Sequence, residues 1–129
     1  MNENELVKAA IDSMGKAYAP YSGFKVGAAL LTDSGRLFTG ANIENASYGA
    51  SICAERAAVY AAVLEGERKF RAIAVAGGSD KPVYPCGICR QVIAEFAEKD
   101  ALKVICANRE GKYEVYMFDE LLPNSFRLE

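Results

Sequence analysis

Three cysteines and one glutamate, placed in two short segments, constrain this chain more than any other feature. Cys53 stands two residues before Glu55, and Pro85 precedes a C-x-x-C pair formed by Cys86 and Cys89. Three thiolates can hold one zinc ion and leave the fourth tetrahedral position open to water. A carboxylate that is not itself a ligand can then move protons to and from that water. The two segments therefore predict a hydrolytic zinc site.

The absence of histidine narrows the chemistry further. The chain has four cysteines and no histidine, which excludes Ser-His-Asp and Cys-His catalysis. Zinc has to be held by sulfur or carboxylate, and a proton shuttle near neutral pH has to be a carboxylate of raised pKa, a lysine, a tyrosine or a thiol. In a reducing compartment, cysteines at these spacings favour metal binding over disulfides.

Length and charge bound the class of protein. A chain of 129 residues, 51% of them hydrophobic, predicts a single domain over residues 1–129. The net charge of −2, without a run of Lys or Arg, disfavours a nucleic acid polymer as partner. Apolar runs stay well short of the roughly 20 residues of a transmembrane helix, and the first residues are acidic where a signal peptide is basic. We expect a cytoplasmic protein that binds no membrane.

Hydrophobic periodicity predicts an α/β fold. Helices are expected over residues 3–17, 53–65, from 86 or 87 to 99, and 119–122, and strands over 24–31, 36–40, 70–77, 102–106 and 113–117. Residues 41–52 lack a period and predict a polar loop. The pattern places Phe24 on the same strand face as Val26, and Leu64 and Ile88 on the buried faces of their helices. This order of elements predicts a mixed sheet with helices on its faces.

Both cysteine segments fall at predicted helix N-termini. Cys86 and Cys89 are three residues apart, so both sulfurs lie on one side of the first turn. Free N–H groups and the positive end of the helix dipole favour thiolates there. A zinc ion held by three thiolates has a net negative charge and is a weaker Lewis acid than zinc held by neutral ligands. A nearby positive charge is therefore needed if its water is to ionise near neutral pH. We expect Arg56 to donate to the ligand sulfurs, with Arg90 as the competing candidate.

The order C-A-E and then P-C-x-x-C resembles the signature of the zinc-dependent deaminases. Residues 42–48 (NIENASY), 85–91 (PCGICRQ) and 120–123 (ELLP) are similar to the short, three-cysteine cytidine deaminases. The resemblance extends from Tyr21 to Phe126. It implies a three-layer α-β-α sandwich with a mixed five-stranded sheet, assembled as a homotetramer with active sites shared between subunits. It also implies the hydrolysis of free cytidine and 2′-deoxycytidine to the uridines, with release of ammonia, in pyrimidine salvage.

The same resemblance implies a role for each site residue. The zinc ligands, one ion per subunit, match Cys53, Cys86 and Cys89, and the proton shuttle matches Glu55. The substrate contacts match Asn42 and Glu44 for the sugar 3′-hydroxyl, Phe24 for packing on the base, the backbone of Ala54 for the carbonyl edge of the base, and Phe126 for reaching a neighbour's pocket. Tyr48 is added as a further substrate-binding residue.

The residues by themselves leave these roles open. Phe24 alternates with Val26 and on that basis belongs to the core, and Phe126 alone is typical of a tail anchor. Asn42 and Glu44 fit turn formers as well as hydroxyl acceptors. Tyr48 fits either a site lining or a contact between subunits.

Three other functions compete with a nucleoside hydrolase. Cys106 can supply a fourth sulfur and close a structural zinc site, although its place in a predicted strand is typical of a small buried hydrophobic residue. Thiol redox chemistry through the C-x-x-C pair leaves Cys53 and Glu55 without a role. Blasticidin-S deaminase shares the zinc motif, but the loop residues 42–48 favour a nucleoside.

Overall fold

A five-stranded mixed sheet with helices on both faces forms the fold, in a computed structural model that describes residues 1–98 and 101–128. The helices are α1 (Glu3–Ser13), α2 (Ala54–Leu64), α3 (Gly87–Phe96) and α4 (Phe118–Leu121), with 3₁₀ turns at Met14–Lys16 and Tyr48–Ala50. The strands are β1 (Val26–Thr32), β2 (Leu37–Ala41), β3 (Phe70–Gly77), β4 (Lys103–Ala107) and β5 (Tyr113–Met117). None of the helices in the described part of the chain has the length and apolar character needed to cross a bilayer.

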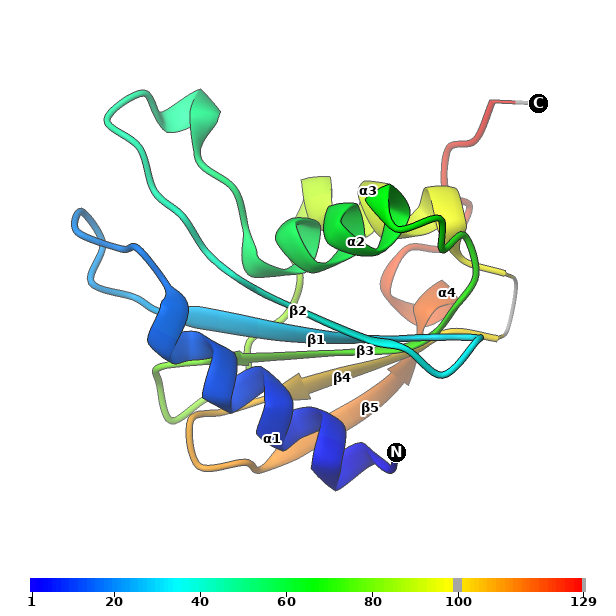
Figure 1. The fold of residues 1–129 in the computed structure, drawn as a ribbon, viewed down its shortest axis with the longest axis horizontal. Coiled ribbons are helices and arrows are strands. Elements are labelled where there is room, and N and C mark those ends of the chain that lie inside the picture. The colour runs from blue at the N-terminus through cyan, green and yellow to red at the C-terminus, as the bar shows by residue number, and fades with distance from the viewer. Residues whose placement is uncertain (99–100, 129) are drawn as a thin grey trace.

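The sheet is mixed because one of its strand pairs is parallel. The strands lie in the order β2-β1-β3-β4-β5. β3 and β4 are parallel, while β2 with β1, β1 with β3, and β4 with β5 are antiparallel. In Figure 1, α1 lies against one face of the sheet, and α2 and α3 lie on the opposite face. The predicted three-layer α-β-α sandwich with a mixed five-stranded sheet is confirmed.

Side chains of the central strands alternate between the two faces of the sheet and so form two hydrophobic cores. Leu30 packs with the α2 and α3 side of the sheet, whereas Leu31 packs with the α1 side. The same alternation along β3 sends Ile73 to the first core and Ala74 to the second. A strand buried on both faces reads as a continuous apolar run, which is why β3 spans the predicted residues 70–77.

The strand predicted over residues 24–31 begins two residues later than expected. Asn42 bonds the main chain on both sides of Lys25, because its Oδ1 accepts from the N–H of Val26 at 2.9 Å and its Nδ2 donates to the carbonyl of Phe24 at 2.8 Å. A side chain therefore takes the place of a strand partner there. Phe24 lies outside β1, and its side chain packs over Gly77.

The predicted helix boundaries and buried faces need four corrections. The first helix ends at Ser13 and continues as a 3₁₀ turn, and α3 ends at Phe96; its predicted end at residue 99 lies outside the described residues. Leu64 is 88% exposed and Ile88 is 60% exposed. The buried face of α2 instead follows Ala54, Ala58, Val59 and Ala62, and that of α3 follows Cys89, Ile93 and Ala94. Both helices are rotated from the expected register, and in α3 Cys89 is fully buried.

Gly40 sets how closely the first turns of α2 approach the sheet. A Cβ at Gly40 would lie 2.5 Å from the carbonyl oxygen of Ala54 and 2.6 Å from the nitrogen of Ala58. Both atoms belong to the backbone, so the helix itself would have to move. The N-terminal part of α2 is therefore held in place by the missing side chain on β2.

We expect Gly40→Ala to destabilise the protein by about 1–3 kcal/mol, the usual range for overpacking. The same shift of α2 should lower zinc retention, because it moves the helix that begins at Cys53. Urea unfolding and zinc content measure the two effects. Gly15→Ala is the matched control, because a Cβ at Gly15 meets nothing within 4 Å; equal behaviour of the two variants contradicts the prediction.

Candidate active site

The three predicted zinc ligands meet at two helix N-termini. Cys53 is the N-cap of α2 and Cys86 is the N-cap of α3, with Cys89 in the first turn of α3. The three sulfurs all lie within 4.8 Å of one another. The predicted placement of both cysteine segments at helix N-termini is confirmed. Neither cysteine side chain accepts a capping hydrogen bond from a backbone N–H of its helix, so both sulfurs can face a common centre.

The spacing of the sulfurs fits zinc. A tetrahedral ion with Zn–S bonds of about 2.3 Å holds two sulfurs about 3.8 Å apart. The Sγ atoms of Cys53 and Cys86 are 3.7 Å apart. Three sulfurs in this arrangement leave one tetrahedral position for a non-protein ligand, which is the donor set of a catalytic rather than a closed structural site.

Cys106 does not join this cluster. It lies in β4, is fully buried, and packs in the core between the sheet and the helices α2 and α3. Burial raises the pKa of its thiol to about 12, so it stays protonated at neutral pH. The geometry therefore disfavours a closed site of four sulfurs and agrees with the small buried hydrophobic residue expected in a strand.

The charge within the cluster falls on Cys53. A hydrogen bond from the Cys89 thiol, together with Arg56, lowers the pKa of Cys53 to about 5. The same pairing raises the pKa of Cys89, since its proton is held between two sulfurs. The pairing therefore favours the thiolate form of Cys53 over that of Cys89, and a metal cation would displace the thiol protons on binding.

Arg56, not Arg90, contacts a ligand sulfur. The Nη2 of Arg56 lies 3.7 Å from the Sγ of Cys53, and its buried Nε has no hydrogen-bond partner among the described residues. Arg90 instead donates to the carbonyls of Pro85 at 2.8 Å and Leu121 at 2.6 Å. Between the two cations considered from the sequence, the geometry favours Arg56 as the one that offsets thiolate charge.

Glu55 is a buried carboxyl beside the cluster. It lies in the first turn of α2 and is only 4% exposed. Burial raises its pKa from an ordinary 4.5 to about 7, and the neighbouring charge of Cys53 adds to the rise. A carboxyl with a pKa near neutrality can accept and return a proton at working pH, which is what a proton shuttle requires.

In zinc-free protein, we expect Glu55→Gln to gain stability over the unmodified chain as pH rises from about 4.5 to about 7. The pKa of Glu55 is raised on folding from 4.5 to about 7, so across this window the carboxyl of the unfolded chain ionises while the buried carboxyl of the folded chain keeps its proton. The unmodified chain therefore loses about 3 kcal/mol of stability by the upper end of the window, since one pKa unit is about 1.4 kcal/mol. Urea unfolding in EDTA across this range measures the difference, and a difference independent of pH contradicts the prediction.

One cavity of about 300 Å³ collects most of the predicted site residues. Its lining includes Asn42, Glu44, Tyr48, Cys53, Ala54, Glu55, Arg56 and Cys86. Phe24, Phe126 and the buried Cys89 lie outside this lining. Phe24 is 38% exposed, and the 68% exposed Phe126 lies in the C-terminal tail, where its carbonyl accepts from Gln91 at 2.9 Å.

Asn42 and Glu44 also hold the loop that precedes β1. Glu44 Oε1 accepts from the N–H groups of Tyr21 and Ser22 at 3.0 Å each, and its Oε2 accepts from the Ser22 hydroxyl. These bonds lower the pKa of Glu44, the Ser22 hydroxyl contributing most. Asn42 bonds the chain around Lys25 in the same way. The bonds orient both side chains at the edge of the cavity, because each is fixed by backbone groups.

Tyr48 marks the open side of the cavity. It is 81% exposed and also lines an adjoining hollow of about 330 Å³ with Tyr21, Ser22 and Glu44. A tyrosine so exposed makes little contact within its own chain. Tyr48 is therefore accessible both to a substrate and to a neighbouring subunit.

Two further cavity residues, Val83 and Tyr84, were given no role by the sequence pattern. They stand just before Pro85, in the segment that leads to α3. Their local sequence signal is weak, because a valine and a tyrosine after a Gly- and Ser-containing loop have no periodicity. Only the pairing of this segment with the end of β4, through the N–H of Val83 and the carbonyl of Ala107 at 3.2 Å, places them here.

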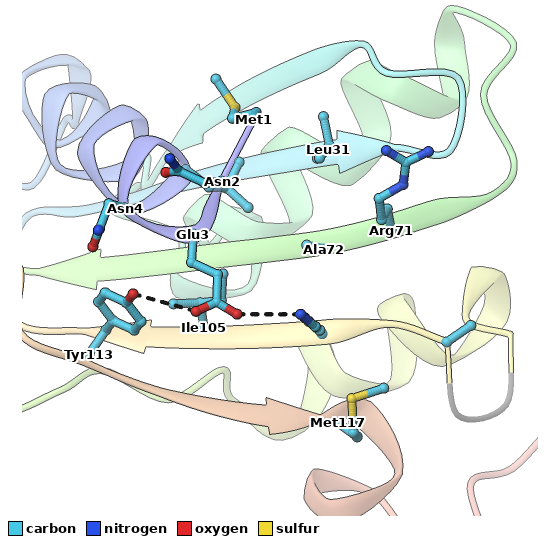
Figure 2. Close-up of a pocket in the computed structure, with 13 residues that line it drawn as sticks. Met1, Asn2, Glu3, Asn4, Leu31, Arg71, Ala72, Ile105, Tyr113 and Met117 are labelled. Carbon is cyan, nitrogen blue, oxygen red and sulfur yellow. Dashed lines mark hydrogen bonds and ion pairs between the residues drawn. The ribbon is translucent and has the colours of Figure 1, made fainter.

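A larger hollow of about 680 Å³ lies away from the cysteines, beside the N-terminal end of α1 (Figure 2). There Glu3 accepts from Tyr113 and pairs with Lys103, each at 3.4 Å. These contacts anchor α1 to β4 and β5. The hollow has none of the cysteines of the zinc cluster in its lining, so it is not part of the candidate active site.

Taken together, a three-sulfur cluster open at one position, a buried carboxyl and an adjoining polar cavity define a zinc-dependent hydrolase. The cluster can hold the metal, and Glu55 can move protons beside it. The cavity has polar groups from Asn42 and Glu44 with which to orient a hydroxylated ligand.

Known proteins identify the family. A model of the cytidine and deoxycytidylate deaminase zinc-binding region matches residues 1–107. A cytidine deaminase of Halalkalibacterium halodurans is 49% identical over 129 residues, which cover 100% of this chain and 97% of that protein. The crystal structure of cytidine deaminase from Burkholderia pseudomallei is 48% identical, with a TM-score of 0.91 over 98% of this chain and 100% of that one. That of the Mycobacterium tuberculosis enzyme is 38% identical, with a TM-score of 0.86 and 99% of each chain covered. The chain belongs to the cytidine deaminase family.

Proposed function

We propose that this protein catalyses the zinc-dependent hydrolytic deamination of free cytidine and 2′-deoxycytidine to uridine and 2′-deoxyuridine. The observation that carries the proposal is the convergence of three sulfurs, all within 4.8 Å of one another, with the 4% exposed Glu55 at one cavity. In the reaction the C4–N bond breaks, a C4–O bond forms, one water is consumed and ammonia leaves. This activity belongs to pyrimidine salvage.

The proposed chemistry assigns the proton transfers to Glu55. Cys53, Cys86 and Cys89 would hold the zinc, which would supply a Lewis acid that activates water for hydrolysis near neutral pH. Glu55 accepts the proton of that water, delivers it to N3 of the base, and later helps protonate the departing ammonia. Arg56 offsets the charge of the sulfurs through its contact with Cys53.

The proposed substrate contacts use groups that retain hydrogen-bonding capacity. Asn42 and Glu44 hold the loop before β1, yet their amide and carboxylate keep a free N–H and free lone pairs for the sugar 3′-hydroxyl. The N–H of Ala54 is one of the first four of α2, which have no partner within the helix, and is available to the carbonyl edge of the base. Phe24 packs on the base, although its side chain is not among those that line the cavity.

The proposed assembly is a homotetramer of single-domain chains, each formed by residues 1–129, in the cytoplasm. Its main support is the exposed apolar tail, in which Phe126 is 68% exposed and Leu128 is 87% exposed. The tail backbone is tied to α3, since the side chain of Gln91 donates to the carbonyl of Phe126 at 2.9 Å. This bond holds the backbone while the Phe126 side chain is exposed, which supports the proposal that the ring enters the pocket of a neighbouring subunit.

We expect Phe126→Ala to raise the KM for cytidine about 10-fold with little change in kcat, because an aromatic wall of the pocket is lost while the proton transfers are untouched. Steady-state kinetics on protein shown by sedimentation to be tetrameric measures this. Leu128→Ala is the control, since it removes another exposed apolar tail residue. An unchanged KM in a tetrameric variant contradicts the shared site.

The substrate assignment is tested by a direct comparison of rates. We expect cytidine and 2′-deoxycytidine to be deaminated at least about 100-fold more efficiently than blasticidin S, because polar groups placed for a sugar hydroxyl are left unpaired by other ligands. A kcat/KM for blasticidin S that equals or exceeds the value for cytidine would assign the protein to the other deaminase activity.

A further inference from the structure

A hydrogen bond between Tyr84 and Glu114 joins the edge of the sheet to the cysteine segment before α3. The Tyr84 hydroxyl donates to Oε1 of Glu114 at 2.5 Å. The Tyr116 hydroxyl donates to the same oxygen at 2.9 Å. The two tyrosine rings meet edge to face, with centroids 6.1 Å apart and an interplanar angle of 65°. Tyr116 therefore supports both the carboxylate and the ring of Tyr84.

The segment that this bond holds leads directly to a zinc ligand. Tyr84 stands two residues before Cys86 and lines the active-site cavity with it. The N–H of Val83 bonds the carbonyl of Ala107, and the carbonyl of the buried Pro85 accepts from Arg90 at 2.8 Å. Tyr84 thus lies between two residues whose backbone groups are hydrogen-bonded to other parts of the chain. Its own side chain adds a third hydrogen bond, to Glu114.

Cys86 depends on this segment more than the other two ligands depend on theirs. Cys89 is fully buried within α3, and Cys53 is partly buried and contacted by Arg56. Cys86 is the exposed member of the cluster and lies at the junction of loop and helix. Surrounding side chains therefore restrict its sulfur least, and the path of residues 83–86 determines where it lies.

We propose that the Tyr84–Glu114 hydrogen bond is a positioning contact that holds Cys86 in place to retain zinc. The bond is charge-assisted, and such bonds are about twice as strong as neutral ones. Tyr84 acts through the backbone of the cysteine segment and not on the substrate, because its hydroxyl is taken up by Glu114. The inference deepens the proposed function and rests on its assignment of Cys86 as a zinc ligand.

The test is the rate of zinc release from the loaded protein into an excess of a chromogenic chelator. We expect Tyr84→Phe to speed release about 10-fold, the lower end of the effect of losing an outer hydrogen bond at a metal site. Glu114→Ala should act similarly, and the double variant should release zinc no faster than the faster single variant.

Tyr116→Phe is the matched control, since it removes a hydrogen bond to the same oxygen while keeping its own ring against Tyr84 and leaving the Tyr84–Glu114 bond in place. We expect it to change release by about two-fold or less, an effect typical of an indirect support. Equal release from Tyr84→Phe and the unmodified chain, or equal acceleration by Tyr84→Phe and Tyr116→Phe, overturns the positioning role. If the unmodified chain purifies without zinc and takes none up, the ligand assignment fails along with the inference. Zinc binding with unchanged release in Tyr84→Phe removes the inference alone.

Discussion

Glu55→Gln is expected to lower kcat by about 10²–10⁴-fold, the usual contribution of a general acid–base, while zinc stays bound. Glutamine has the shape of the buried glutamate but cannot accept or return a proton. The fall should appear in kcat and not in KM alone, since the lost proton transfers occur in the chemical step. Following the loss of cytidine absorbance in the ultraviolet, together with zinc content, measures both parts of the prediction.

The matched control is Glu95→Gln, which changes an exposed glutamate of α3 in the same way. It should leave kcat within about two-fold, as surface changes usually do. A Glu55→Gln variant that holds zinc and keeps the activity of the unmodified chain would remove Glu55 from the mechanism. It would also leave the raised pKa of this carboxyl without a functional explanation.

The second large effect is expected at the cysteines. Replacing Cys53, Cys86 or Cys89 with Ala should reduce zinc to well below one ion per chain and lower kcat/KM by at least about 100-fold, because two sulfurs cannot complete the site. Metal analysis of dialysed protein and the cytidine assay measure the two losses. Loss of activity with zinc fully retained would contradict the ligand assignment.

Cys106→Ala separates this account from a closed structural site. Cys106 is a buried residue of β4 outside the sulfur cluster, so its replacement should retain both zinc and activity. A modest loss of stability is expected, because a small cavity forms in the core. Loss of zinc from this variant, at unchanged secondary structure, would support four sulfur ligands.

Local sequence signals predicted the scaffold of the site well. The order of strands and helices follows from periodicity, and the two cysteine segments fall at helix N-caps as expected. Such features depend on residues close together in the chain. Errors appeared where a distant residue decides the outcome: the side chain of Asn42 makes β1 begin only at Val26, and packing turns Ile88 outward.

The walls of the cavity were less predictable than its chemical groups. Cysteine, glutamate and arginine have distinctive chemistry, so a spacing pattern could nominate them. The side chain of Tyr84 is held by Glu114, which lies 30 residues further along the chain. Its role depends on the pairing of β4 with β5, and periodicity alone cannot show that pairing. Phe24 was predicted as a strand residue from its alternation with Val26. In the structure, the Asn42 side chain bonds the carbonyl of Phe24, and β1 begins only at Val26.

The most direct test of the central claim is to follow cytidine, uridine and ammonia together with zinc-loaded and zinc-stripped protein. We expect the loaded protein to convert cytidine to equal amounts of uridine and ammonia. Stripping zinc should abolish the conversion, and restoring zinc should recover it. A fully zinc-loaded, folded protein that leaves cytidine unchanged, or a stripped protein that converts it at the same rate, would contradict the account.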